Sequence, residues 1–175
     1  PVSRALAVEA LRLMGRVLQR AVDTPGDIEA RSDMLLGSML AGQAFANSPV
    51  AAVHALAYPI GGHYKVPHGL SNALVLPHVL RFNAEVAPQA YADLLPHVFP
   101  EVSAEGVDDA AMKFVGGMAA LSRTCGLQQN LRDMGVKKEA LPMLASDAMN
   151  QSRLLVNNPR PVDEAAALKI YEAAW

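Results

Sequence analysis

Three of the five histidines lie within residues 53–69, and this stretch is the part of the chain best suited to metal chemistry. These histidines are His54, His63 and His68. Neutral imidazole is a common ligand of divalent metals. Pro67 favours the first turn of a helix and so places His68 near the positive end of the helix dipole, where the neutral ring is preferred. Because Gly61-Gly62 lets the chain reverse, His54 and His68 can converge on one cation.

Spacing alone leaves a plainer alternative open, since a buried histidine is more often a hydrogen-bonded core residue than a ligand. A short helix over residues 50–58 puts His54 and Tyr58 on the face where the core is expected. The chain lacks two histidines one helical turn apart, and it has no paired C-x-x-C motif. His63 is expected in a loop beside the glycines, and His78 and His97 are expected to be structural. None of these three is assigned to a metal.

The elements that carry these residues are predicted to be helical, because apolar side chains recur at helical spacing and alternating runs are almost absent. Helices are expected near residues 3–22, 28–46, 50–58, 67–83, 88–98, 107–124, 137–148 and 162–174. Ser3 and Asp27 are predicted N-caps. Pro59 is expected to end the third helix and Pro77 to kink the fourth. The pattern predicts an all-α fold, an orthogonal multi-helix bundle.

Composition limits the class of protein and its partners. The chain has 175 residues, of which 51% are hydrophobic, which is enough for a folded core in a single domain. Fifteen basic and 17 acidic residues give a net charge of −2, which argues against nucleic acid and anionic membrane as partners. The apolar runs are too short to cross a bilayer. A single cysteine, Cys125, excludes an intrachain disulfide and favours a cytoplasmic location.

The first residues suggest that the chain is part of a longer protein. It opens Pro1-Val2-Ser3-Arg4, without an initiator methionine, and a helical pattern is under way by about Leu6. An apolar face that would contact another domain is therefore expected near Phe45, Tyr58 and His68. We expect this face to be covered by self-association into a homo-oligomer, or by the missing part of the protein.

The residues around the histidines form a long ordered motif. It reads His54-x-x-x-Tyr58-Pro59-x-Gly61-Gly62, then Val66-Pro67-His68-Gly69-x-x-Asn72-Ala73. It extends through Leu76-Pro77-His78-Val79 and Phe82-Asn83, back to Ala41-Gly42-x-Ala44-Phe45-x-Asn47, and forward to Asn157-Asn158-Pro159-Arg160 and the closing Tyr171 to Trp175. This motif resembles the histidine signature of iron-containing (group III) alcohol dehydrogenases, and the resemblance covers essentially the whole chain.

The resemblance implies a fold, a metal and a nucleotide cofactor. In that family, which shares the dehydroquinate-synthase-like fold, an N-terminal nucleotide-binding domain precedes a helical domain. A divalent metal between the two domains is held by one aspartate and three histidines. His54 and His68 match the last two ligand positions, so residues 1–175 would be a single helical metal-binding domain. The other two ligands and the glycine-rich pyrophosphate motif would lie upstream of Pro1. Fe²⁺ or Zn²⁺ is the implied metal, and NAD(P) would be bound mainly by the absent N-terminal domain.

Two further positions match residues on the substrate side of the family's site. Some members carry a histidine where this chain has Tyr58, beside the nicotinamide and the substrate. Tyr58 can still donate or relay a proton, although its unperturbed acidity is far lower than that of imidazole. Phe45 matches an aromatic residue that lines the substrate pocket. For both residues the plainer alternative is simple aromatic packing.

The resemblance therefore predicts an enzyme when the protein is intact. It would move a hydride between a small alcohol or aldehyde and NAD(P), and this chain alone would be inactive. One alternative is a maleylacetate reductase-like member of the same superfamily, although those enzymes lack this close motif. The other is a non-catalytic helical module that binds a metal or a partner chain.

Overall fold

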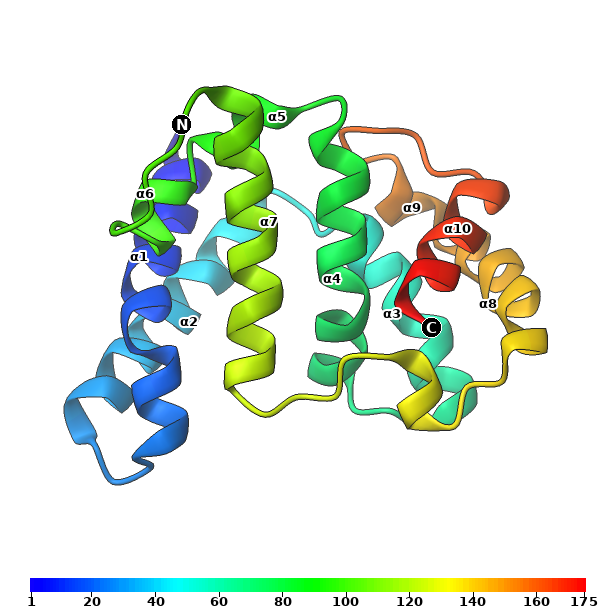
Figure 1. The fold of residues 1–175 in the computed structure, drawn as a ribbon, viewed down its shortest axis with the longest axis horizontal. Helices are drawn as coiled ribbons and strands as arrows, with labels where there is room; N and C mark the ends of the chain where they lie inside the picture. The colour runs from blue at the N-terminus through cyan, green and yellow to red at the C-terminus, as the bar shows by residue number, and fades with distance from the viewer. The chain divides into compact units, whose positions relative to one another are not determined.

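The computed structural model describes all 175 residues, and every regular element in it is a helix (Figure 1). The predicted all-α class is confirmed. The chain divides into two compact units, each built from two stretches of sequence. The first unit is Pro1–Pro49 with Pro88–Cys125, and the second is Val50–Ala87 with Gly126–Trp175. None of the helices combines the length and apolar character that crossing a bilayer requires.

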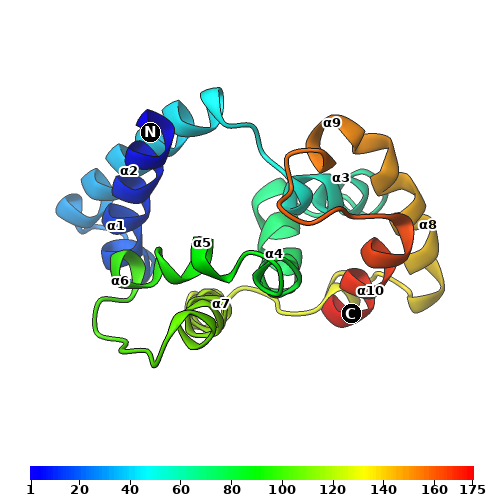
Figure 2. The ribbon, with the colours of Figure 1, turned by 90° about the horizontal axis from the view of Figure 1, so that it is seen from above.

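The first unit is organised around a pair of long helices. It contains α1 (Val2–Asp23), α2 (Ile28–Asn47), α5 (Pro88–Ala92), α6 (Leu95–Val98) and α7 (Val107–Thr124). Helices α1 and α2 pack along each other (Figure 2). The approach is close at Gly37, where a Cβ atom would lie 2.5 Å from Cγ of Met14. A larger residue at this position would therefore require the Met14 side chain to move.

The second unit carries the histidine motif. It contains α3 (Ala52–Tyr64), α4 (His68–Ala84), η1 (Leu131–Met134), η2 (Lys138–Ala140), α8 (Leu141–Ala148), η3 (Met149–Gln151), α9 (Ser152–Leu155) and α10 (Glu164–Ala174). Its core lies where α3, α4, α8 and α10 meet. The largest fully buried side chains there include Leu56, Ile60 and Tyr171. These residues hold the helices that carry the histidines.

The predicted end of the third helix at Tyr58 is wrong, because α3 continues through Pro59 to Tyr64. Proline has no N–H, so its place in the helix leaves the carbonyl group of Ala55 without its usual donor. Pro59 and Ile60 are buried, and we infer that their packing offsets the lost hydrogen bond. The chain leaves the helix at Lys65, which has a left-handed φ of 58° and donates its N–H to the Gly61 carbonyl. The two glycines are therefore helical and do not form the predicted loop.

The other predicted helix boundaries agree with the structure to different extents. Asp27 caps α2 as predicted, its Oδ1 accepting a 2.9 Å hydrogen bond from the Ala30 N–H. Ser3 is not the N-cap of α1, which begins at Val2 without a side-chain cap. The helix predicted over 88–98 is two short helices, α5 and α6, and the one predicted over 137–148 opens as the 3₁₀ turn η2. Helix α7 spans the predicted residues 107–124.

Candidate metal and substrate site

His54 and His68 lie side by side in the second unit. Their ring centroids are 5.2 Å apart, with the ring planes at 54°. His54 is in the first turn of α3, and His68 is the first residue of α4. The short link from Lys65 to Pro67 joins the two helices and brings these turns together. Two imidazoles on one tetrahedral ion, with each nitrogen about 2.1 Å from the metal, place their ring centroids roughly 5 Å apart. The observed separation fits that arrangement.

The electrostatics of His54 favour the form that binds metals. Its side chain is half-buried, and burial lowers the pKa of the imidazole, as does the charge of His68 to a smaller extent. A pKa below the usual value means that His54 is neutral at pH 7 and keeps a lone pair on one ring nitrogen. Burial and the neighbouring ring therefore keep His54 in its neutral form.

Asn72 adds a polar group that the sequence reasoning did not assign to the site. Its Nδ2 lies 3.1 Å from Nε2 of His68, one helical turn away on α4. Its Oδ1 is buried and has no hydrogen-bond partner. Buried acceptors are nearly always satisfied, so an orphaned one on a residue that contacts His68 fits a place for a cation or its bound water. The four-residue spacing from His68 was the signal in the sequence that could have identified Asn72.

Tyr58 stacks on the second histidine of the pair. Its ring centroid is 5.9 Å from that of His68, and the ring planes differ by 26°. The side chain is 39% exposed, so the prediction that His54 and Tyr58 point into the core is wrong. Helix α3 buries Leu56 and Ile60 instead, which turns the histidine face outward. Tyr58 therefore lies beside the histidine pair with part of its side chain exposed.

Phe45, the predicted substrate-pocket residue, lies near the end of α2 in the first unit. Its side chain is 58% exposed. An exposed aromatic ring is available for a ligand or for another part of a larger protein. Its role in a substrate pocket stays a prediction.

The remaining histidines lie outside the pair. His63 is in the last turn of α3 and not in the predicted loop, and its Nε2 is 2.9 Å from Oδ2 of Asp147 on α8. His78 is on α4, where burial lowers its pKa, and His97 is on α6. No three His, Cys, Asp or Glu side chains in the chain are grouped so that they could hold a metal ion. The two imidazoles that lie side by side are those of His54 and His68.

The chain is all-helical and presents two neighbouring imidazoles beside a partly exposed tyrosine. The sequence model of the Fe-containing alcohol dehydrogenase family, C-terminal, matches residues 1–175. This chain belongs to that family.

Individual relatives agree with this assignment. Over its full length the chain is 37% identical to a 1,3-propanediol dehydrogenase of Klebsiella pneumoniae and 40% identical to long-chain-alcohol dehydrogenase 1 of Geobacillus thermodenitrificans. It covers 45% and 44% of those proteins, so it spans less than half the length of the relatives it matches. The crystal structure of a 1,3-propanediol oxidoreductase superposes with a TM-score of 0.96 at 37% identity, over all of this chain and 46% of that one.

Proposed function

We propose that this chain is the metal-binding and substrate-binding part of an iron-dependent alcohol dehydrogenase. The reaction would transfer a hydride between a small alcohol or aldehyde and NAD(P). The observation that carries the proposal is the 5.2 Å separation of the His54 and His68 rings, within a chain of this family. His54 and His68 would hold the metal, with an aspartate and a further histidine supplied by another part of the protein.

The residues present fit a divalent cation. His54 is held neutral by burial, so its lone pair is free to coordinate. The orphaned Oδ1 of Asn72 supports the presence of a cation or a metal-bound water near His68. A bound divalent metal would act as a Lewis acid on the oxygen of the alcohol or aldehyde.

The other residues of the chain would act on the substrate directly. Tyr58 stacks on His68 and is partly exposed, and its hydroxyl would donate or relay a proton. Phe45 would cover the apolar part of the substrate, which needs contact area and no polar partner.

The nucleotide cofactor would be bound mainly by a separate N-terminal domain. The chain contains no strand followed by a glycine-rich turn, which is the feature that cradles a pyrophosphate. The relatives are more than twice as long as the match, which leaves room for such a domain. We propose that residues 1–175 act as one helical metal-binding domain beside it, and that the exposed Phe45 and Tyr58 help to form the contact or a homo-oligomer interface.

Metal analysis of the purified protein, combined with anomalous scattering from its crystals, tests the proposal directly. We expect a single metal peak within coordination distance of both His54 and His68. A metal bound elsewhere, with both imidazoles uncoordinated, would contradict the assignment. Assays with aldehydes and with maleylacetate, each with NADH or NADPH, would then separate the alcohol dehydrogenase from its reductase relatives.

A further inference from the structure

The loop before α10 contacts both of the helices that carry the histidine pair. It runs from Asn157 to Arg160 and lies, like the pair itself, within the second unit. His54 is on α3 and His68 is on α4. The separation of the two imidazole rings therefore depends on how these two helices are held relative to each other.

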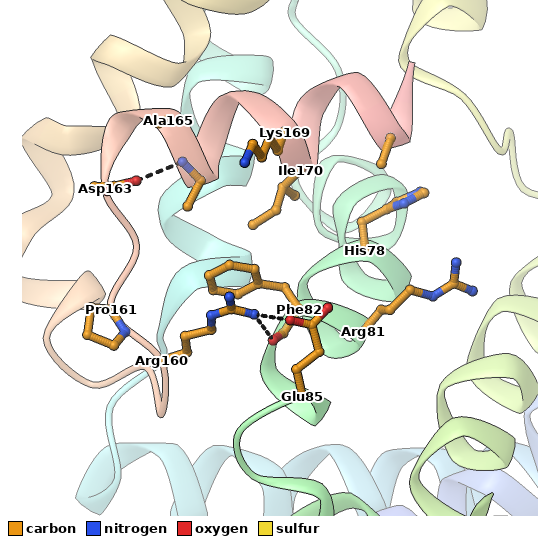
Figure 3. Close-up of a pocket in the computed structure, with 12 residues that line it drawn as sticks. His78, Arg81, Phe82, Glu85, Arg160, Pro161, Asp163, Ala165, Lys169 and Ile170 are labelled. Carbon is orange, nitrogen blue, oxygen red and sulfur yellow. Dashed lines mark hydrogen bonds and ion pairs between the residues drawn. The ribbon is translucent and has the colours of Figure 1, made fainter. Parts of the chain in front are cut away.

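The loop is anchored to the C-terminal end of α4. Asn158 and Asn83 form a reciprocal amide pair, in which Nδ2 of each donates to Oδ1 of the other at 2.7 Å and 2.9 Å. Arg160 donates a 3.0 Å hydrogen bond to the Phe82 carbonyl oxygen and forms an ion pair with Glu85 (Figure 3). Asn83 is only 3% exposed, so breaking its amide pair would leave buried polar atoms unsatisfied. The loop is therefore held in place relative to α4.

The first residue of the loop contacts the chain just before α3. Nδ2 of Asn157 donates a 3.1 Å hydrogen bond to the carbonyl oxygen of Val50, which lies 107 positions earlier in the sequence. The same amide donates a second 3.1 Å hydrogen bond to the carbonyl oxygen of Arg153, so both of its N–H groups are used. Because Asn157 is adjacent to Asn158, the loop joins the start of α3 to the anchored end of α4.

His54 lies in the part of α3 that the helix itself restrains least. The helix begins at Ala52, so His54 is in its first turn, and the N-cap residue Ala51 forms no side-chain hydrogen bond. The N–H groups of a first turn have no partner within the helix, and helix ends fray. The hydrogen bond from the loop to Val50 therefore acts where the turn that carries His54 needs support from outside the helix.

We propose that Asn157 is a positioning residue for the metal site. Through its hydrogen bond to Val50, it holds the first turn of α3 at the distance from α4 that lets His54 and His68 share one cation. This inference rests on the proposed metal-binding role of the two histidines. A small shift of one ligand is enough to weaken such a site, because metal–ligand distances are kept to within about 0.2 Å.

Binding of Co²⁺ to the intact protein tests the proposal, because the visible absorption of bound Co²⁺ reports the geometry of its ligands. The Asn157 side chain is exposed, so Asn157→Ala should still fold. This variant should bind Co²⁺ roughly tenfold more weakly, which is the smaller loss expected when a group that supports a ligand is removed. The absorption spectrum of the bound ion should also change.

Two further variants make the result decisive. Asn130→Ala is the matched control, because the Asn130 amide donates a local 3.3 Å hydrogen bond to Asp133 in the same unit, and it should keep the affinity and the spectrum. If Asn157→Ala behaves like this control, Asn157 has a structural role alone and the proposal is wrong. His54→Ala separates the two proposals. Loss of Co²⁺ binding in His54→Ala with unchanged binding in Asn157→Ala would refute only the positioning role, whereas full binding in His54→Ala would refute the metal site as well.

Discussion

The hydroxyl of Tyr171 donates a 2.6 Å hydrogen bond to the carbonyl oxygen of Leu56, which joins α10 to α3 two residues from His54. Tyr171 is fully buried, and burial raises the pKa of its hydroxyl, so the donor proton is retained at any ordinary pH. The last helix of the chain thereby fixes the position of the helix that carries the first histidine.

Replacing Tyr171 by Phe should lower the free energy of unfolding by about 1–2 kcal/mol, because the ring is kept but a buried hydrogen bond is lost. Chemical denaturation measures the change. Tyr64→Phe is the control, since the Tyr64 hydroxyl makes no hydrogen bond in the structure. An equal loss of stability in the two variants would show that the Tyr171 hydrogen bond contributes nothing of its own.

The histidine pair gives a prediction for the metal. In the intact protein, His54→Ala or His68→Ala should weaken metal binding by at least roughly 100-fold, since changing even a group that only supports a ligand costs 10–100-fold. Metal content after dialysis and alcohol oxidation should fall together. His97 lies on α6 of the first unit, so His97→Ala should keep both the metal content and the alcohol oxidation. Full metal content and turnover in His68→Ala would remove His68 from the site.

Residues 1–175 alone should show no NAD(P)-dependent alcohol oxidation and should bind divalent metal weakly. Two neutral imidazoles bring no negative charge to a cation, and a hydride acceptor would not be positioned for transfer. Adding an N-terminal nucleotide-binding domain from a relative should restore metal binding and activity. Turnover by a verified single chain of these residues would contradict the expectation.

Neighbouring glycines on α7 should respond to alanine in opposite directions. A Cβ at Gly117 would lie 2.5 Å from the ring of Phe99, whereas one at Gly116 would meet nothing within 4 Å. Gly117→Ala should therefore destabilise the protein by about 1–3 kcal/mol through overpacking. Gly116→Ala should stabilise it by up to about 1 kcal/mol, because alanine favours the helix. Thermal unfolding of the two variants separates these outcomes.

His78 should make the protein less stable as the pH falls. Its folded-state pKa is lowered, mainly by burial, so below about pH 6.5 the unfolded chain binds the proton more readily than the folded one. This loss of stability continues until the pH passes the folded pKa. His78→Gln should make the folding stability depend less steeply on pH, and the slope should change by no more than about 1.4 kcal/mol per pH unit. Stability measured at pH 8, where histidine is neutral in both states, isolates any effect of the substitution on packing. Identical slopes of stability against pH for the two proteins in acid would exclude His78 as a source of the pH dependence.

The sequence by itself determined the helical class, most helix positions and the closeness of His54 and His68, but not the place of Asn72 beside them. These features depend on local information. Apolar periodicity along 107–124 predicts α7, Asp27 provides a cap, and the segment between His54 and His68 predicts that the two imidazoles converge. Each of these signals lies within a few turns of the residues that it describes.

Only the tertiary structure decided how far α3 extends and which of its faces is buried. Locally, Pro59 favours the end of a helix, but Pro59 and Ile60 are buried in a core completed by residues as distant as Tyr171. The contact between His63 and Asp147 likewise joins residues far apart in sequence. The alanine-rich helix over 52–64 has little amphipathic contrast, so local periodicity cannot say which side it buries. Packing against the remote helices makes that choice, and it turns His54 and Tyr58 outward.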